Sequence, residues 1–290
     1  MEIYVQSAGI SEEHDYCWQK VDTPGRVDEP DLVKYFKYLL QTESPSILIG
    51  CKNLIGYKKN HLILLITGMK ADRKDYRGRT IRNSVAFISQ DNPDEQRKIR
   101  DIAVHALREE KELSTVINSF IISGGKYGFN FDFQEQETGK NDYLLKKIPS
   151  IGRKDSKNYN EKNKQKLMIG KNSEENKIAI AFDLEHIELS ELMEGSEALV
   201  VVTGIKAEDT LKKAGVWRGL SNLVAKAELS SYVKKSNIND ESKNLQKQFF
   251  ETETIVLYGL MFVIVISLFF FFYKLLPVDL NSQVNTVDKH

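Results

Sequence analysis

A nine-residue phrase occurs twice in this chain, as ILLITGMKA at residues 63–71 and as LVVVTGIKA at residues 199–207. In each copy a β-branched, apolar run ends in Thr-Gly, which is followed by a hydrophobic residue and Lys-Ala. An aromatic-Arg-Gly triplet comes after both copies, at residues 76–78 and 217–219. Because runs of this composition favour β-strands, the repetition predicts two equivalent strand-turn units and hence an internal duplication.

The segments around both copies predict an α/β fold with a mixed sheet. Apolar runs of strand length are found at residues 2–8, 46–50, 61–68, 79–89, 177–187 and 197–204. Residues 31–41 have the apolar spacing of a helix, and Asn92 and Pro93 are the cap and first-turn residues of another that continues to about residue 121. Hairpins and crossovers both fit these spacings, so the strand directions stay open.

Changes in composition divide the chain into six parts. A first α/β half and a shorter second half are separated by a Lys- and Asn-rich linker or surface loop, and a polar stalk, an apolar segment and a short tail follow. The expected bounds are 1–150 for the first half, 151–177 for the linker, 178–233 for the second half, 234–253 for the stalk, 254–273 for the apolar segment and 274–290 for the tail.

The apolar segment at 254–273 reads TIVLYGLMFVIVISLFFFFY and carries no charge. As a helix, a run of this length is about 30 Å long, which matches the hydrocarbon core of a bilayer. We therefore expect the α/β domain to be followed by a single C-terminal transmembrane helix. More lysines precede the run than follow it, and no secretory signal opens the chain. The expected location is the cell membrane, with the N-terminal domain in the cytoplasm.

Charge and cysteine content exclude several classes of protein. Charged residues make up 28% of the chain and balance to a net charge of +0, so no overall field attracts polyanions, and no sequence-specific nucleic-acid module is found. The 2 cysteines stand far apart, which gives neither a disulfide framework nor a zinc site. No motif indicates a cofactor. The glycines at 124 and 125 follow a helix, which favours a helix C-cap over a phosphate loop.

The basic residues that follow the repeated phrase form the candidate ligand site. If both strand ends open at one edge of the sheet, their side chains surround a common space, and strand ends are favoured ligand sites in α/β sheets. Guanidinium groups also bind phosphates with two parallel hydrogen bonds. The candidate anion-binding residues are Lys70, Arg77, Arg79, Arg82, Lys206 and Arg218. A surface for a partner protein and a scaffold without a ligand are the open alternatives.

Asp183 and Glu185 are the candidates for a catalytic role. They alternate on the expected strand at 177–187, so their carboxylates project from one face and are placed to hold a divalent metal or to act as acid and base. Neither a third acid nor a nearby lysine completes a hydrolase site, and an exposed strand face explains the pair equally well. We therefore expect a protein that acts without catalysis, with a metal-dependent hydrolase as an alternative.

A soluble domain followed by one terminal span is similar to the layout of tail-anchored membrane effectors and accessory proteins of prokaryotic defence systems. The resemblance rests on the order of the parts along the whole chain and not on a motif. It implies a cytoplasmic domain that senses a ligand or partner and signals to, or perturbs, the membrane in antiviral defence. The phosphate-binding residues that it implies are Lys70, Arg77, Lys206 and Arg218.

The expected partners follow from the same layout. They are the lipid bilayer, a protein partner or a second copy of the chain, and a nucleotide or other anionic ligand. A membrane-anchored scaffold that recruits a partner protein is the alternative function.

Overall fold

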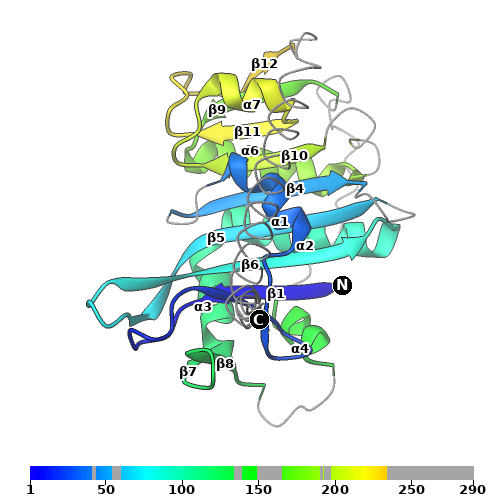
Figure 1. Ribbon diagram of the computed structural model, residues 1–290. Coiled ribbons are helices and arrows are strands. Elements are labelled where there is room, and N and C mark those ends of the chain that lie inside the picture. The colour runs from blue at the N-terminus through cyan, green and yellow to red at the C-terminus, as the bar shows by residue number, and fades with distance from the viewer. Residues whose placement is uncertain are drawn as a thin grey trace, which may run out of the picture. The chain divides into compact units, whose positions relative to one another are not determined.

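Ten strands form one mixed sheet in the order β12-β9-β11-β10-β4-β5-β6-β1-β2-β3 (Figure 1). The computed structural model describes residues 1–40, 44–53, 60–133, 139–148, 165–189, 192 and 197–233. The strands are β1 Glu2–Ser7, β2 Cys17–Lys20, β3 Arg26–Val27, β4 Ser46–Lys52, β5 His61–Lys74, β6 Thr80–Gln90, β9 Leu167–Lys171, β10 Ala198–Thr203, β11 Arg218–Ser221 and β12 Ser230–Tyr232, and β7 Ile121–Ser123 and β8 Phe129–Phe131 form a separate pair.

Two strand arrangements share this sheet. From β4 to β3 every neighbouring pair is antiparallel. By contrast, β9, β11 and β10 are parallel to one another. The two regions join where β10 pairs with β4 in antiparallel fashion. The predicted mixed sheet is therefore confirmed, and residues from both expected halves contribute to it.

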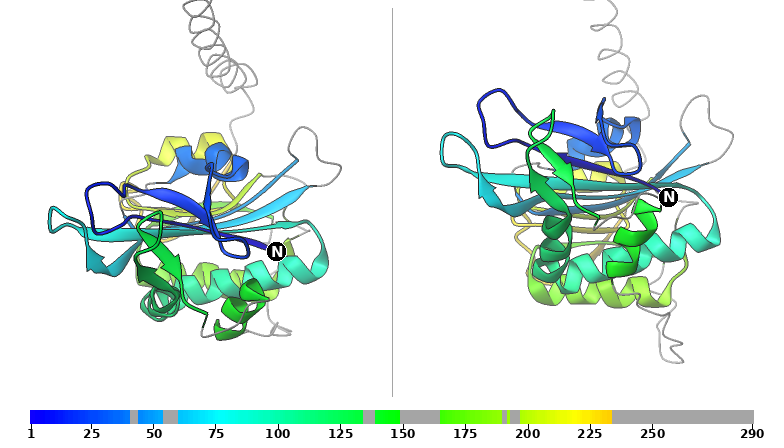
Figure 2. Two further views of the ribbon diagram at one scale, coloured as in Figure 1. Left: turned by 60° about the horizontal axis from the view of Figure 1, so that its bottom comes forward. Right: turned by 90° about the horizontal axis from the view of Figure 1, so that it is seen from below.

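Helices cover both faces of the sheet (Figure 2). Their bounds are α1 Asp31–Phe36, the 3-10 turn η1 Lys37–Leu39, α2 Pro93–Arg108, α3 Glu110–Phe120, α4 Lys140–Lys147, α6 Glu174–His186 and α7 Glu208–Ala214. A large apolar core lies between the sheet and α2, α3 and α6. A smaller core lies on the opposite face, under α1, η1 and α7. The central strands β4 and β5 are apolar on both faces because both faces are buried.

The repeated phrase forms two strands that flank β4 in the same register. Leu64 of β5 and Val200 of β10 both pair with Ile49. The next two positions of each copy likewise pair with the same two residues of β4. Both strands are antiparallel to β4, so they run in the same direction. The predicted equivalence of the two copies is confirmed for the strands.

Beyond the Thr-Gly pair the two copies differ. Gly68 has a φ of +72° and lies at a register shift, where β5 bulges and continues to Lys74. A Cβ atom at Gly68 would lie 2.2 Å from the carbonyl carbon of Ser44, so only glycine fits there. After Gly204 the chain instead leaves the sheet and enters α7. The two aromatic-Arg-Gly triplets consequently occupy unrelated places, a hairpin turn and the buried strand β11.

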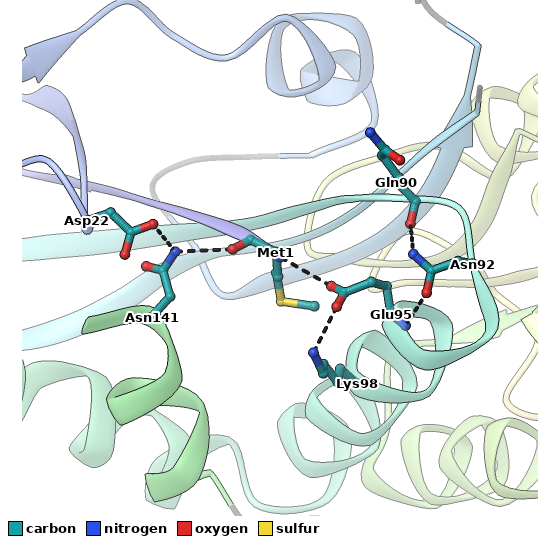
Figure 3. A network of polar contacts seen from close by, with 7 residues as sticks. All are labelled: Met1, Asp22, Gln90, Asn92, Glu95, Lys98 and Asn141. Atoms are coloured by element: carbon teal, nitrogen blue, oxygen red, sulfur yellow. Dashed lines mark hydrogen bonds and ion pairs between the residues drawn. The ribbon is translucent and has the colours of Figure 1, made fainter. Parts of the chain in front are cut away.

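The predicted helix behind Asn92 is confirmed at its start, but the structure divides it at Glu109 into α2 and α3. The Asn92 side chain accepts a hydrogen bond from the Glu95 amide at 3.0 Å, as an N-cap does. Figure 3 shows how this end of α2 is held. The Glu95 carboxylate accepts a hydrogen bond from Lys98 at 2.8 Å and lies 3.4 Å from the Met1 amino group, while Asn141 of α4 donates to the Met1 carbonyl at 3.1 Å. The network therefore links the residue that precedes β1 to α2 and α4.

Two predictions of local structure are wrong. Residues 177–187 are expected as a strand, but 177–186 belong to helix α6, whose N-cap is Ser173 and whose C-cap is Ile187. Its apolar residues lie on both the buried and the exposed sides, which hides the helical period from the sequence. The glycines at 124 and 125 lie in the turn between β7 and β8, not in a helix C-cap, and both have positive φ.

The predicted fold is also corrected at its C-terminal part. We expected the α/β domain to be followed by a membrane-spanning helix. Across the residues that the structure describes, no helix is both long enough and apolar enough to cross a membrane. The segments expected as stalk, span and tail, from residue 234 onwards, lie outside the described residues. In the expected linker, residues 151–164 also lie outside them, whereas 165–177 include β9 and the start of α6.

Candidate functional site

Strands β5 and β6 extend past the other central strands as a two-stranded hairpin (Figure 2). The pairing of β5 with β4 ends at Thr67. The pairing of β6 with β1 begins at Ser84. Residues 68–82, between these two points, form the segment that we call the basic arm. A small apolar cluster of Ala8, Ala71 and Ile81 anchors its base.

Six basic and two acidic side chains lie on the basic arm. The basic residues are Lys70, Arg73, Lys74, Arg77, Arg79 and Arg82, and the acidic residues are Asp72 and Asp75. Arg73 and Arg82 are half-buried, whereas the other four basic side chains are exposed. The arm thus carries an excess of positive charge in a chain whose overall charge is balanced.

Asp75 is fully engaged in shaping the turn of the arm. Its carboxylate accepts hydrogen bonds from the backbone amides of Arg77 and Arg79, each at 2.9 Å, and from the Arg79 guanidinium at 2.8 Å. Desolvation alone would raise the pKa of Asp75, but these hydrogen bonds hold it below its usual range. Asp75 therefore neutralises Arg79 and leaves the charges of the other basic residues of the arm in place.

Arg73 and Arg82 hold their positive charges at the base of the arm against neutral oxygen atoms. Arg73 donates to the Ser7 hydroxyl at 2.7 Å and to the Ala8 carbonyl at 3.4 Å. Arg82 donates to the Gly68 carbonyl at 3.0 Å. Burial lowers the pKa of Arg73. Within the described part of the chain, neither guanidinium forms an ion pair with a carboxylate.

Exposed tyrosines accompany these arginines. Tyr16, from the loop between β1 and β2, accepts a hydrogen bond through its hydroxyl from the Arg82 amide at 2.9 Å. Tyr76, at the turn of the arm, has the Arg77 guanidinium 5.0 Å from its ring centroid. The two side chains remain 44% and 46% exposed, respectively, so their rings are accessible to a partner.

Two further turns lie beside the base of the arm (Figure 2). His14 in the β1–β2 loop contacts the Lys126 carbonyl in the β7–β8 turn at 3.2 Å. Gly9 and Gly128 allow the two backbones to approach, because a Cβ on Gly9 would lie 2.8 Å from the Gly128 Cα atom. The β1–β2 loop also carries Glu12, Glu13 and Asp15, so the positive charge is concentrated on the arm itself.

The structure separates the predicted anion-binding residues into three groups. Lys70, Arg77, Arg79 and Arg82 lie together on the basic arm. Lys206 lies in the turn between β10 and α7. Arg218 is fully buried in β11, where its Nε donates to Asp183 at 2.6 Å and its guanidinium stacks on Trp217 at 3.9 Å. The sequence did not reveal this separation, because the two aromatic-Arg-Gly triplets have the same residue pattern. Only the burial of β11 in the folded protein distinguishes them.

The two strand ends of the repeated phrase do lie at one edge of the sheet. Thr67 pairs with Ser46, and Thr203 pairs with Ser221. All four hydroxyl side chains are buried. Among the described residues, the Thr203 hydroxyl is buried without a hydrogen-bond partner. The edge is therefore packed and does not present the open cationic space that the repetition suggested.

Asp183 and Glu185, the predicted catalytic pair, lie on helix α6 and not on a strand. Asp183 accepts from Arg218, whereas Glu185 is buried and paired with both terminal nitrogens of Arg108, one of them at 3.0 Å. Each carboxylate thus serves a different ion pair. No group of three potential metal ligands is found in the described ranges.

Comparison with known proteins adds no relative. No protein-family model matches the chain, and no curated protein or solved structure is significantly similar to it.

Proposed function

We propose that this domain is a non-enzymatic recognition module that binds a polyanionic partner through the basic arm. The observation that carries the proposal is the state of Arg73 and Arg82. Both guanidinium groups are half-buried at the base of a projecting hairpin, and both are hydrogen-bonded to neutral oxygen atoms.

The physical reason is the cost of burying a charge. A half-buried cation loses part of its hydration, and neutral acceptors replace that loss less well than a carboxylate or phosphate does. The positive charge is therefore incompletely compensated and attracts an approaching anionic group. A guanidinium group binds such an oxyanion through two parallel hydrogen bonds. Lys70, Lys74 and Arg77 extend the positive field along the arm and favour an extended anion over a small one.

The arrangement favours binding over chemistry. The arm offers positive charge and exposed rings, but nothing on it is built as a nucleophile with a positioned base. The expected hydrolase pair is committed to two ion pairs elsewhere. These observations support recognition, with the basic arm as the contact surface.

The experiment compares two double variants of the full-length protein on immobilised heparin, a sulfated polyanion. Lys74→Ala with Arg77→Ala removes two exposed charges from the arm, and Lys213→Ala with Lys226→Ala removes two exposed charges near α7 and β12. We expect the arm variant to elute at clearly lower salt and the matched control to elute with the wild type. Equal elution of both variants, or no retention of the wild type, would overturn the proposal.

A further inference from the structure

We infer that the polyanion bound by the basic arm is single-stranded nucleic acid, recognised without sequence preference. This inference rests on the proposed function and deepens it by naming the partner. It is carried by a second observation, the exposed tyrosine rings that stand beside the arginines.

Aromatic rings and cations together suit unpaired bases. Every base has a flat face that stacks on an aromatic ring, and the phosphates between bases are drawn to lysine and arginine. Tyr76 presents its ring at the turn of the arm next to Arg77. Tyr16 is fixed beside Arg82 by the hydrogen bond to its hydroxyl, which leaves its half-exposed ring in a defined place. A ring held in advance loses less conformational entropy when a base stacks on it.

The size of the arm also fits a strand of nucleic acid. From Gly68 to Lys74 β5 contributes seven residues to the arm, which span on the order of 20 Å at the rise of an antiparallel strand. A single nucleic-acid strand advances by a similar distance over about six stacked nucleotides. The cations of the arm therefore lie at distances that successive phosphates can meet.

Paired bases would not use these features. In a duplex the bases stack on each other, so an exposed tyrosine finds no free base face without the cost of unstacking. Headgroups of a membrane and acidic peptides would be held by the cations alone and would gain little from Tyr76. The absence of a sequence-reading module in the sequence is consistent with backbone and stacking contacts as the basis of recognition.

The test measures binding of the full-length protein to labelled oligothymidylate of about a dozen nucleotides, using fluorescence anisotropy. The comparison probes are a duplex of the same length, heparin and vesicles that contain anionic lipid. Three single variants are compared with the wild type. Tyr76→Leu removes the ring, Tyr76→Phe keeps it, and Tyr38→Leu removes a tyrosine of similar exposure from η1.

We expect Tyr76→Leu to weaken oligothymidylate binding by between about 5-fold and about 100-fold and to leave heparin binding unchanged. Tyr76→Phe and Tyr38→Leu should bind as the wild type does. The inference fails, and the proposed function stands, if duplex, heparin or vesicles bind at least as tightly as oligothymidylate, or if Tyr76→Leu binds it normally. If none of the polyanions binds, the proposed function fails as well.

Discussion

At the scale of single residues, the fate of each arginine depends on the oxygen atom that it reaches. Arg218 is fully buried and paired with Asp183, so its charge forms an ion pair inside the fold and does not reach the surface. Among the described residues, Arg73 and Arg82 reach a hydroxyl and carbonyl oxygens but no carboxylate, so their charges remain available. The same residue type thus stabilises the interior in one place and creates a binding surface in another.

Replacing Asp183 by Asn should therefore destabilise the protein. The substitution takes a charged hydrogen-bond acceptor away from the buried Arg218 guanidinium, which costs about 3 kcal/mol of the free energy of unfolding. Urea unfolding followed by circular dichroism measures the change. Glu174→Gln is the control, because that exposed carboxylate lies on the same helix and contributes little. A stable Asp183→Asn protein would show that the pair is not structural.

Thr203 is a position where we expect a substitution to stabilise the protein. Its buried hydroxyl lacks a hydrogen-bond partner among the described residues, whereas the Thr67 hydroxyl at the equivalent position of the other copy is not unpaired. Thr203→Val should raise the free energy of unfolding by about 1 kcal/mol, because it removes an unsatisfied polar atom at almost constant shape. Thr67→Val should not stabilise. Chemical denaturation measures the free energy of unfolding of both variants. An equal change in Thr203→Val and Thr67→Val would contradict the prediction.

At the scale of elements, capping side chains determine where helices begin. Asn92 caps α2, and Ser173 caps α6 by accepting from the Asn176 amide. Asn92→Ala should lower the free energy of unfolding by about 1 kcal/mol, since a helix amide loses its acceptor. Ser173→Ala should act in the same direction. Thermal unfolding of the two variants tests this, and no change in either would show that the ends of these helices are held by packing alone.

The turn of the basic arm should loosen in acid while the sheet stays folded. Asp75 has its pKa held below the usual range by hydrogen bonds that exist only in the folded arm. The contribution of the charged carboxylate to the turn is therefore complete above the pKa that Asp75 has in an unfolded chain, and it is lost as the pH falls through the lowered, folded value. Amide hydrogen exchange at Arg77 and Arg79 reports the loosening.

Asp75→Asn provides the control for this pH dependence. The amide cannot titrate in this range, so the exchange rates of the two arm amides, corrected for the intrinsic effect of pH, should not change between neutral and acidic solution. If the wild type and Asp75→Asn respond identically to acid, another group controls the turn.

At the scale of the whole molecule, segments from both halves expected from the sequence meet in one compact unit. Met1–Lys235 forms a single compact unit. β10, from the second half, pairs with β4, from the first, and Glu185 of α6 is paired with Arg108 of α2. Neither half can satisfy these groups by itself. The expected defence role and membrane location concern the chain as a whole and stay predictions.

Fragments 1–150 and 165–233 should each fail to fold, whereas fragment 1–235 should unfold in one cooperative step. Separation of the halves exposes the edges of β4 and β10 and the apolar face of α6, whose burial stabilises the sheet. Circular dichroism and one-dimensional proton NMR of the three fragments test this. A well-dispersed spectrum from either fragment alone would show that this half folds without the other.

The sequence by itself determined the elements whose causes are local. The apolar strands β4, β5, β6 and β10 and the cap of α2 follow from composition and from the chemistry of a few neighbouring side chains. The clustering of Lys70, Arg77, Arg79 and Arg82 also follows, because one hairpin carries all four.

Only the tertiary structure decided the features that depend on long-range contacts. α6 is a helix because Ile180, Ala181 and Leu184 bury one side of it, although its sequence is apolar on the other side too. Arg218 became an interior residue because Asp183, 35 positions away, faces it. Arg73 and Arg82 stay available because the base of the arm gives them only neutral acceptors. Burial and pairing between distant segments have no local signal, so the sequence alone could not assign these roles.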